Sequence, residues 1–331
     1  MKSQTKSIEN VYIKSTFSSG GDKESGGPLG NYFDAVYSDD LLGQDSWETA
    51  ESTLMKNTLS GAITAANMTS NDIEILYAGD LLDQCTASSF GLKAFDIPFF
   101  GLYGACSTFV EGLCLASISI SGGFFENAAV VTSSHFCSSE KQYRFPLEYG
   151  EVRTPTSQWT VTGSGSAVLT RKNADLKITN ITVGKIVDLG VTDANNMGAA
   201  MAPSASDTIY THLKETGRAP DFYDIIVTGD LANVGSEILY ELLDKNGIDI
   251  RGNHADCGSL IFDPKSQNVN AGGSGCGCIA SVFSGYFSKK MLNNEFSKIL
   301  LIATGALMSP SSVLLGEPIS GIAHAVSIER V

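Results

Sequence analysis

Two halves of this chain carry the same sequence patterns in the same order. The apolar string IEILYAGDL, which ends at Leu81, is matched by YDIIVTGDL, which ends at Leu231. Further along, NAAVVTSSH is matched by KILLIATGA. Short, nearly continuous apolar strings are typical of strands buried on both faces of a sheet. The repeat therefore predicts a duplicated α/β unit, with residues 1–172 as the N-terminal half and residues 173–331 as the C-terminal half.

Each half also contains a glycine-rich turn that leads into a helix of small, apolar residues. These turns are GLYGACST, which contains Cys106, and AGGSGCGC, which contains Cys276. Since such helices are apolar nearly all round, we expect both to be buried in the middle of the molecule. An amphipathic helix is expected earlier in each half, with Ser46 as the N-cap of the first and Gly217 at the end of the second. The sequence therefore predicts an α/β protein, a five-layer αβαβα sandwich of two pseudo-symmetric halves.

The charge of the chain excludes some classes of partner. The net charge is −14 without a cluster of Lys and Arg residues, and phosphate backbones need a basic surface, so we expect no nucleic-acid partner. The apolar runs are far shorter than a membrane span, and the N-terminal residues lack the apolar core of a signal peptide. We therefore expect a soluble chain without direct membrane insertion, which reaches a membrane only through a protein partner.

The seven cysteines are an odd number, and we expect them to be reduced thiols. Cys276 and Cys278 form a C-x-C pair, but no second pair with the spacing of zinc ligands follows, so we predict no metal site. Cys106 stands at the predicted start of a buried helix, where the helix dipole lowers the pKa of a thiol. It is a nucleophile, the relic of one, or a small packing residue.

Several long strings carry a family resemblance that covers essentially the whole chain. FDIPFFGLYGACSTFVEGLCLA resembles the nucleophile segment of the thiolase superfamily, in its ketoacyl-synthase-III-like branch, where the reactive cysteine begins the buried helix. Four further strings are similar, in order, to the stage V sporulation protein AD family of spore-forming Firmicutes: GLYGACST, TSSHFCSSEKQYRFPLEYG, PTSQWTVTGSGSAVL and HADCGSLIFD with NAGGSGCGC.

The resemblance also indicates where the catalytic pattern of condensing enzymes is broken. Those enzymes combine the cysteine, here Cys106, with a His and an Asn that donate hydrogen bonds to developing negative charge. This chain has Asp230 at the position of the His, followed by a retained Asn233, and Gly273 stands at about the position of the Asn. An ionised carboxylate repels an oxyanion, so we predict a chain that is not an enzyme and keeps Cys106 as a relic nucleophile. His254, in the inserted string HADCGSLIFD, is a candidate replacement for the lost His.

The resemblance implies a function in binding. Proteins of this family bind dipicolinic acid (pyridine-2,6-dicarboxylate), free or as its calcium chelate, for uptake into the forespore and release at germination. They act with the SpoVA membrane proteins of the same operon, so the resemblance places the chain in the spore, at the periphery of the inner membrane. No cofactor is expected apart from Ca²⁺ carried with the ligand. Proteins of this fold usually dimerise through the strand after the cysteine helix, here residues 127–134, so a homodimer is also expected.

A flat aromatic dianion needs hydrogen-bond donors or cations at both ends and flat apolar walls. Asp80 and Asp230, at equivalent strand ends, oppose a bare dianion but suit a calcium chelate. The predicted donors are backbone N–H groups at the two buried helix starts: Cys106 and Ser107, and Gly272, Gly273, Ser274 and Gly275. The other predicted ligand-binding residues supply positive charge, an amide or an apolar wall: His135, Arg144, Asn233, Leu81 and Leu82.

Each of these candidates has a structural alternative. The two aspartates are also typical turn and cap residues, and the glycine run also serves close helix packing. His135 is a candidate core histidine, and Arg144 a candidate partner of Glu140 or Glu148.

Three functions compete on this sequence. The first is a ligand-binding protein, the second is an acyltransferase or thioesterase that uses Cys106, and the third is a scaffold with a vestigial pocket. A Cys106 adduct formed from acyl-CoA would favour the second, and ligand binding that is absent or insensitive to pocket mutations would favour the third.

Outside the site, we expect His212 to be exposed, His324 to have a structural role, and residues 18–34 to form a glycine-rich loop without an assigned role.

Overall fold

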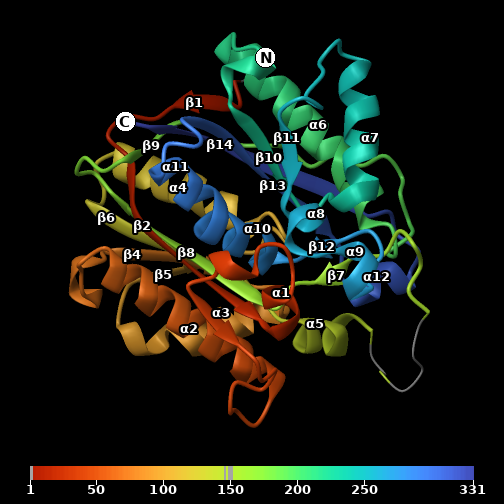
Figure 1. The fold of residues 1–331 in the computed structure, drawn as a ribbon, viewed down its shortest axis with the longest axis horizontal. Coiled ribbons are helices and arrows are strands. Elements are labelled where there is room, and N and C mark those ends of the chain that lie inside the picture. The colour runs from red at the N-terminus through yellow and green to blue at the C-terminus, as the bar shows by residue number, and fades with distance from the viewer. Residues whose placement is uncertain (1–2, 145–146, 148–151) are drawn as a thin grey trace.

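The computed structural model describes residues 3–144, 147 and 152–331. The first half of the chain supplies the strands β1 (Thr5–Ser7), β2 (Tyr12–Gly21), β3 (Ala35–Tyr37), β4 (Ile75–Gly79), β5 (Phe99–Gly101), β6 (Asn127–Ser134) and β8 (Gly163–Thr170). The second half supplies β9 (Leu176–Thr182), β10 (Ile225–Gly229), β11 (His254–Asp256), β13 (Lys298–Leu307) and β14 (Ser320–Arg330). These strands form one 12-stranded sheet with the main order β11–β10–β13–β14–β9–β2–β8–β6–β4–β5 (Figure 1). A separate two-stranded sheet is formed by β7 (Trp159–Thr160) and β12 (Gly273–Ser274).

The two halves of the sheet have the same topology, as the sequence repeat predicts. In the first half, β4 is parallel to β5 and β6, whereas β8 is antiparallel to β6 and β2. In the second half, β10 is parallel to β11 and β13, whereas β14 is antiparallel to β13 and β9. The half-sheets join where Tyr12 and Ile13 of β2 pair with β9. The division of the chain between residues 172 and 173 stays a prediction.

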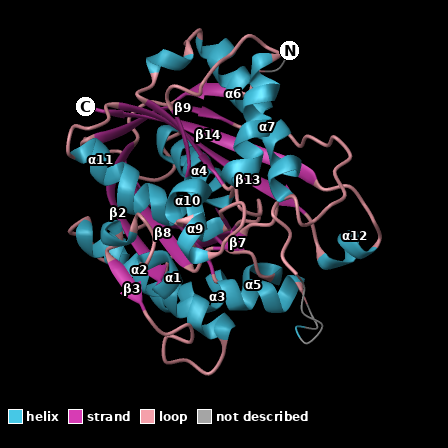
Figure 2. Ribbon diagram, turned by 45° about the vertical axis from the view of Figure 1, so that its right-hand side comes forward, coloured by secondary structure: helices cyan, strands magenta, loops and turns pink. Residues whose placement is uncertain are grey.

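Helices lie in three layers around the two half-sheets (Figures 1 and 2). The outer face of the first half-sheet is covered by α2 (Trp47–Ala65) and α3 (Thr86–Leu92), and that of the second by α6 (Met197–Thr216) and α7 (Ala232–Asp244). Between the half-sheets lie α4 (Thr108–Ser121) and α10 (Cys276–Val282), which continues through the π-helical residues Phe283–Phe287 into α11 (Ser288–Leu292). This is the predicted αβαβα sandwich, with the two small-residue helices in its middle layer.

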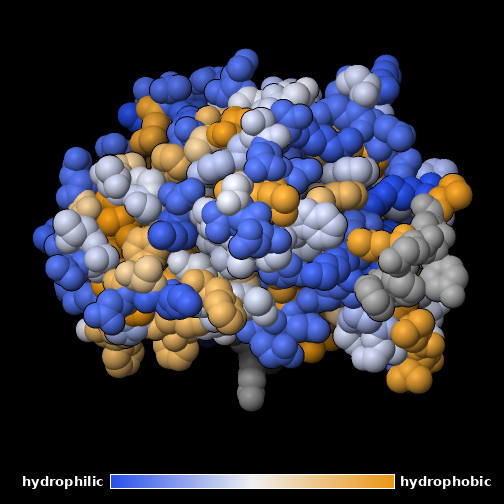
Figure 3. Space-filling model, turned by 90° about the horizontal axis from the view of Figure 1, so that it is seen from below, coloured by the Kyte–Doolittle hydropathy of each residue, from blue (hydrophilic) through white to orange (hydrophobic). Residues whose placement is uncertain are grey.

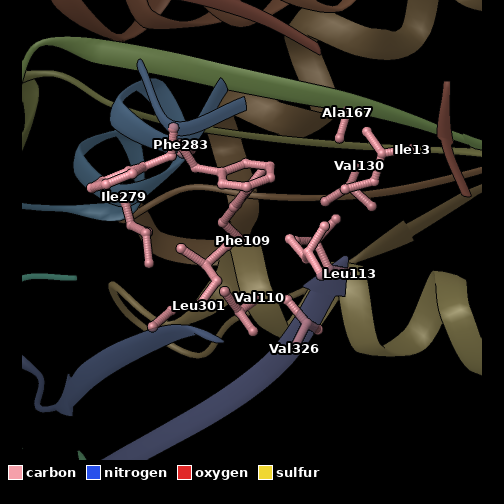
Figure 4. Close-up of a cluster of buried hydrophobic side chains, with 14 of the residues drawn as sticks. Ile13, Phe109, Val110, Leu113, Val130, Ala167, Ile279, Phe283, Leu301 and Val326 are labelled. Atoms are coloured by element: carbon pink, nitrogen blue, oxygen red, sulfur yellow. The ribbon is translucent and has the colours of Figure 1, made fainter. Parts of the chain in front are cut away.

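Buried apolar side chains fill the space around the middle helices (Figure 4). Phe109 of α4 packs against Phe283, with ring centroids 6.1 Å apart. Gly277 brings α10 close to β8, because a Cβ atom at that position would lie 2.1 Å from the carbonyl oxygen of Gly163. The small residues that the sequence concentrates in this helix therefore serve close packing of helix against sheet.

Local sequence signals set the ends of the outer helices. At the start of α2, Ser46 Oγ accepts a hydrogen bond from Thr49 N, and the Thr49 side chain accepts one from Ser46 N, which forms a capping box. At the end of α6, Gly217 adopts a positive φ of 67°, a conformation that favours glycine. Both ends agree with the sequence prediction.

The remaining helices are short: α1 (Asp22–Ser25), α5 (Phe136–Tyr143), α8 (Cys257–Ile261), α9 (Pro264–Gln267) and α12 (Pro310–Leu314).

The structure corrects two expectations about single segments. His212 is fully buried rather than exposed, because its ring nitrogens bond to the Thr182 and Tyr223 hydroxyls at 2.7 and 2.6 Å. The glycine-rich residues 18–34 are not a free loop, since they include the end of β2 and α1. Lys23 Nζ donates to the Gln267 carbonyl and Gln267 Nε2 donates to the Lys23 carbonyl, both at 2.6 Å, so this segment is tied to α9. His324 has the structural role that we expect, because its Nδ1 accepts from Gly184 N at 3.2 Å.

The expectation that residues 127–134 form a dimer contact is wrong. They form β6, which is paired with β4 on one side and β8 on the other, so this strand has no free edge. In the first half-sheet, the strand at the free edge is β5. Phe99 and Phe100 of β5 are 38% and 56% exposed.

One face of the molecule shows how hydrophilic and hydrophobic side chains are distributed on the surface. Hydrophilic side chains cover most of the face in Figure 3, and hydrophobic ones gather toward its left and right edges. Within the described ranges, no helix combines the length and the apolar character that crossing a membrane requires.

Candidate functional site

The site is built around the ends of two equivalent strands. Asp80 follows β4 directly, Asp230 follows β10 directly, and both side chains are fully buried. Two cysteines at the starts of the middle helices lie near these aspartates. Cys276 is the first residue of α10, and Cys106 precedes α4 by two residues. The backbone is strained here, since Ala105 and Asp230 have φ values of 50° and 71°. Such strain is a feature of functional sites.

Cys106 belongs to a small cluster with Leu81, Cys276 and the partly exposed Tyr143, which we call the cysteine cluster. The Cys106 side chain is only 6% exposed. Burial, with Asp230 as the nearest acid, raises the pKa of the Cys106 thiol well above its ordinary value. The sequence-based expectation of a lowered pKa is therefore wrong, because burial outweighs the helix dipole at a residue that lies outside the helix proper. Cys106 is a protonated thiol at neutral pH.

Asp230 is a buried acid whose environment favours the protonated form. Its Oδ2 accepts a hydrogen bond from Gly275 N at 3.0 Å, and its Oδ1 has no partner among the residues that the structure describes. Burial raises the pKa of Asp230 well above its ordinary value, and the Cys106 and Cys278 thiols lie beside the carboxyl group. A neutral carboxylic acid can donate a hydrogen bond, so Asp230 is chemically suited to meet a carboxylate of a ligand.

Asp80 forms a buried pair with Glu51, a residue that the sequence analysis missed. Asp80 accepts hydrogen bonds from the backbone N–H groups of Leu82 and Ser88 at 2.9 and 2.8 Å. Asp80 therefore has the structural role of a turn and cap residue, which the sequence analysis gave as the alternative to ligand binding. Glu51 accepts from the Ser133 and Ser138 hydroxyls at 3.0 and 2.6 Å. Burial, with Asp80 nearby, raises the pKa of Glu51 to about 8. The sequence signal that could have indicated the burial of Glu51 is its position in α2 beside buried residues such as Leu54.

The two predicted sources of positive charge are engaged elsewhere. His135 is fully buried; its Nδ1 accepts from Cys137 N at 3.2 Å, and its Nε2 donates to the Asp40 carbonyl at 2.8 Å. Burial lowers the pKa of His135, so the ring is neutral at pH 7. Arg144 Nε pairs with Glu140 Oε2 at 3.1 Å, whereas Glu148 lies outside the described residues. The expectation that His135 supplies positive charge is therefore wrong. Arg144 forms the ion pair with Glu140 that the sequence analysis gave as the structural alternative to ligand binding.

Most of the predicted backbone donors are also bonded within the chain. Ser107 N donates to the Gly104 carbonyl at 3.1 Å, and Gly272 N donates to the Val269 carbonyl at 3.2 Å. Gly273 and Ser274 form β12 and pair with β7. The glycine run thus has the packing role weighed as its alternative, and its role in ligand binding stays a prediction.

Two side chains from the C-terminal half lie away from the cysteine cluster. Asn233 is exposed, and its Oδ1 accepts from the Ser259 hydroxyl at 2.9 Å. Both ring nitrogens of His254 are engaged, with the Thr228 hydroxyl at 2.9 Å and the Tyr240 hydroxyl at 2.8 Å. Burial lowers the pKa of His254 to about 4, so this ring is neutral. His254 is therefore a bonded part of the second half-sheet edge, and its replacement of a catalytic His stays a prediction.

Two cavities of the molecule are lined by residues outside the cysteine cluster. One of about 440 Å³ is lined by Thr5, Arg218 and Glu329 near β1, and one of about 480 Å³ is lined by Lys93 and Phe99 beside β5. Within the cysteine cluster, Leu81, Cys106 and Cys276 are 7%, 6% and 0% exposed, so these side chains are closed off from solvent in this structure. Across the described part of the chain, His, Cys, Asp and Glu residues form no group of three arranged for a metal ion. All seven cysteines are free thiols.

The duplicated topology and the two buried middle helices define a protein with a thiolase-like fold. The solved structure of 3-oxoacyl-[acyl-carrier-protein] synthase III from Aquifex aeolicus VF5 superposes with a TM-score of 0.59 at 15% identity, covering 96% of this chain and 99% of that one. A variant of OleA from Xanthomonas campestris gives a TM-score of 0.64 at 16% identity, covering 98% and 99%. At these identities the likeness shows the fold alone.

The chain belongs to the Stage V sporulation protein AD family, whose sequence model matches residues 2–329. Stage V sporulation protein AD of Bacillus subtilis (strain 168) is 43% identical over 320 residues, which cover 97% of this chain and 94% of that protein. The present chain is thus a sporulation protein with a thiolase-like fold, as its sequence motifs predict.

Proposed function

We propose that this chain is a non-catalytic protein that binds dipicolinic acid, as its calcium chelate, at the cysteine cluster. Binding would serve uptake into the forespore and release at germination, at the inner membrane beside the SpoVA proteins. The observation that carries the proposal is the set of buried carboxyl groups with raised pKa values around the thiols, in a chain that belongs to this sporulation family.

The charge of the site favours the chelate over the free dianion. Asp80, Asp230 and Glu51 have raised pKa values because of burial, and the cationic side chains proposed for this site are bonded elsewhere. A bare dianion would raise these pKa values further and gain no compensating cation. A one-to-one calcium chelate is neutral overall, and its carboxylate oxygens can accept hydrogen bonds from the neutral acid of Asp230. The side chains of Leu81 and Tyr143 supply flat apolar surface for the pyridine ring.

The same geometry supports the non-catalytic reading over an acyltransferase or thioesterase. Cys106 is protonated rather than a thiolate, and nucleophilic attack needs the thiolate. The sequence resemblance puts Asp230 at the position of the histidine of condensing enzymes, and His254 is bonded to Thr228 and Tyr240. The third function, a scaffold with a vestigial pocket, differs from our proposal in predicting no saturable ligand binding.

A homodimer remains part of the proposal, with its contact moved to β5. The edge of β5 is unpaired, and Phe99 and Phe100 are exposed beside it. An antiparallel second copy would cover both the backbone groups and the aromatic rings. Sedimentation of the native chain and of Phe100→Lys tests this contact: we expect a dimer for the first and a monomer for the second.

Equilibrium dialysis of calcium dipicolinate against two Asp230 variants tests the proposed site. Asp230→Asn keeps a neutral hydrogen-bond donor, so we expect affinity within a few-fold of the native chain. Asp230→Leu removes the donor, and the lost hydrogen bond to a carboxylate is worth about 1.5–3 kcal/mol, so we expect at least a tenfold loss. Equal affinity for both variants would show that the ligand does not meet Asp230.

A further inference from the structure

Two tyrosine hydroxyls are in contact at the cysteine cluster. The hydroxyls of Tyr103, which follows β5, and Tyr143, the last residue of α5, are 3.0 Å apart. Tyr143 also donates a hydrogen bond to the carbonyl of Leu81 at 2.9 Å. A phenol has one proton to donate, so Tyr103 is the donor in the contact between the two hydroxyls. Tyr143 is thus held by two hydrogen bonds and Tyr103 by one.

The end of α5 is fastened to the segment after β4 by a neighbouring residue. Gln142 Nε2 donates to the same Leu81 carbonyl at 3.0 Å, and Gln142 Oε1 accepts from Asp83 N at 2.9 Å. The backbone around Tyr143 is therefore anchored independently of its own hydroxyl. A change at that hydroxyl will free the aromatic side chain while the helix end stays in place.

The tyrosine pair extends from the buried thiols to the protein surface. Tyr103 is 44% exposed, whereas Leu81 and Cys106 are only 7% and 6% exposed. Tyr143 is the partly exposed residue that packs directly on the buried members of the cysteine cluster. Burial raises the pKa of Tyr103 to about 12, and the Cys106 and Cys276 thiols contribute to this shift, which agrees with their closeness. Both phenols are therefore neutral donors at physiological pH.

We propose that Tyr143 is the gate of the cysteine cluster, held closed by its hydrogen bonds to the Leu81 carbonyl and Tyr103. In the open state the Tyr143 ring swings away from Cys106, and its hydroxyl becomes free to donate to a carboxylate of the entering ligand. The gate deepens the proposed function. The identity of the ligand, a planar aromatic dicarboxylate, rests on that proposed function. The gate itself is a property of the closed cluster and holds whether or not that ligand is the right one.

Alkylation of Cys106 by iodoacetamide measures gate opening without any ligand. The native protein, Tyr143→Phe and Tyr103→Phe are labelled for increasing times, and Cys106 labelling is read by peptide mass spectrometry. Tyr143→Phe loses both hydrogen bonds and Tyr103→Phe only one, so we expect the Cys106 rate to rise at least tenfold in the first and about fivefold in the second. The matched control Tyr240→Phe removes a tyrosine hydroxyl that bonds to His254 instead, and we expect it to leave the Cys106 rate unchanged.

Cys114 serves as an internal report on unfolding, because it lies in the core of α4 at 3% exposure. The gate predicts that Cys106 labelling accelerates while Cys114 labelling does not. An unchanged Cys106 rate in Tyr143→Phe would overturn the gate, and so would equal acceleration at both cysteines, which would show that the whole fold has loosened.

A second measurement separates the gate from the proposed function. Stopped-flow mixing with one-to-one calcium dipicolinate should show faster association in Tyr143→Phe than in the native chain, by the same factor as Cys106 labelling. If labelling accelerates but calcium dipicolinate does not bind the native chain, the gate stands and the proposed ligand fails. If the ligand binds but labelling is unchanged, the ligand stands and the gate fails.

Discussion

Replacing Glu51 with glutamine should remove much of the pH dependence of stability of this protein. Burial raises the pKa of Glu51 from an ordinary 4.5 to about 8. The folded chain therefore holds a proton that the unfolded chain releases above about pH 4.5, and stability falls as the pH rises toward and through 8. Each pH unit in that window costs about 1.4 kcal/mol, so Glu51 alone lowers the free energy of unfolding by about 3 kcal/mol between about pH 5.5 and 8.

The Glu51→Gln variant keeps the shape of the side chain but cannot ionise. It loses one of the two acceptor oxygens that the Ser133 and Ser138 hydroxyls use, which costs about 1 kcal/mol. Ionisation of Glu51 in the unfolded chain already costs the native protein about 1.4 kcal/mol at about pH 5.5. Urea unfolding should therefore give stability curves that cross at about pH 5, with the variant less stable than the native chain at about pH 4.5 and more stable at about pH 8. Part of the pH dependence should persist in the variant, because burial raises the pKa of Glu24 to about 7.

A matched control lies one turn earlier in the same helix. Glu48 is partly exposed and bonds to Lys141 at 2.7 Å, so Glu48→Gln should change stability by less than about 1 kcal/mol and keep the native pH dependence. If Glu51→Gln instead loses stability with pH as steeply as the native chain, Glu51 is not protonated in the folded state. The account of the site as a set of neutral acids would then be wrong.

Further predictions concern the packing and the chemistry of the middle layer. Gly277→Ala should destabilise the fold by about 1–3 kcal/mol in urea unfolding because its Cβ would meet the Gly163 carbonyl, while Gly252→Ala, with open space around it, should stay within about 0.5 kcal/mol. Phe109→Ala should cost about 3–5 kcal/mol in the same assay, because Phe109 is fully buried. Incubation with acyl-CoA should leave the intact mass unchanged at pH 7; an adduct that Cys106→Ala abolishes would favour the acyltransferase.

The fold was predictable because its signals are local and repeated. Strings such as IEILYAGDL and YDIIVTGDL mark equivalent buried strands, and Ser46 and Gly217 mark the ends of outer helices. Each of these depends on nearby residues or on a period that the sequence shows directly. The pairing order of the strands then follows from the duplication, since the same patterns in the same order build the same half-sheet twice.

The electrostatics of the site were less predictable because they depend on contacts between distant segments. The pKa of Cys106 is set by burial against residues of the opposite half, including Asp230, and not by the helix that follows it. Burial in the assembled fold lowers the pKa of His135, and a hydrogen bond to the Asp40 carbonyl, 95 positions away, opposes this shift. Glu51 and Tyr143 gave no motif of their own, and only the assembled fold brings them to the site.

Calorimetric titration of the native chain and of Cys106→Ala, with dipicolinate alone and with its one-to-one calcium chelate, tests the central claim most directly. The account predicts saturable one-to-one binding that is at least tenfold tighter for the chelate than for the free dianion, and weaker in Cys106→Ala. Tighter binding of the free dianion, affinity unchanged by Cys106→Ala, or no binding of either form would contradict a calcium dipicolinate site at the cysteine cluster.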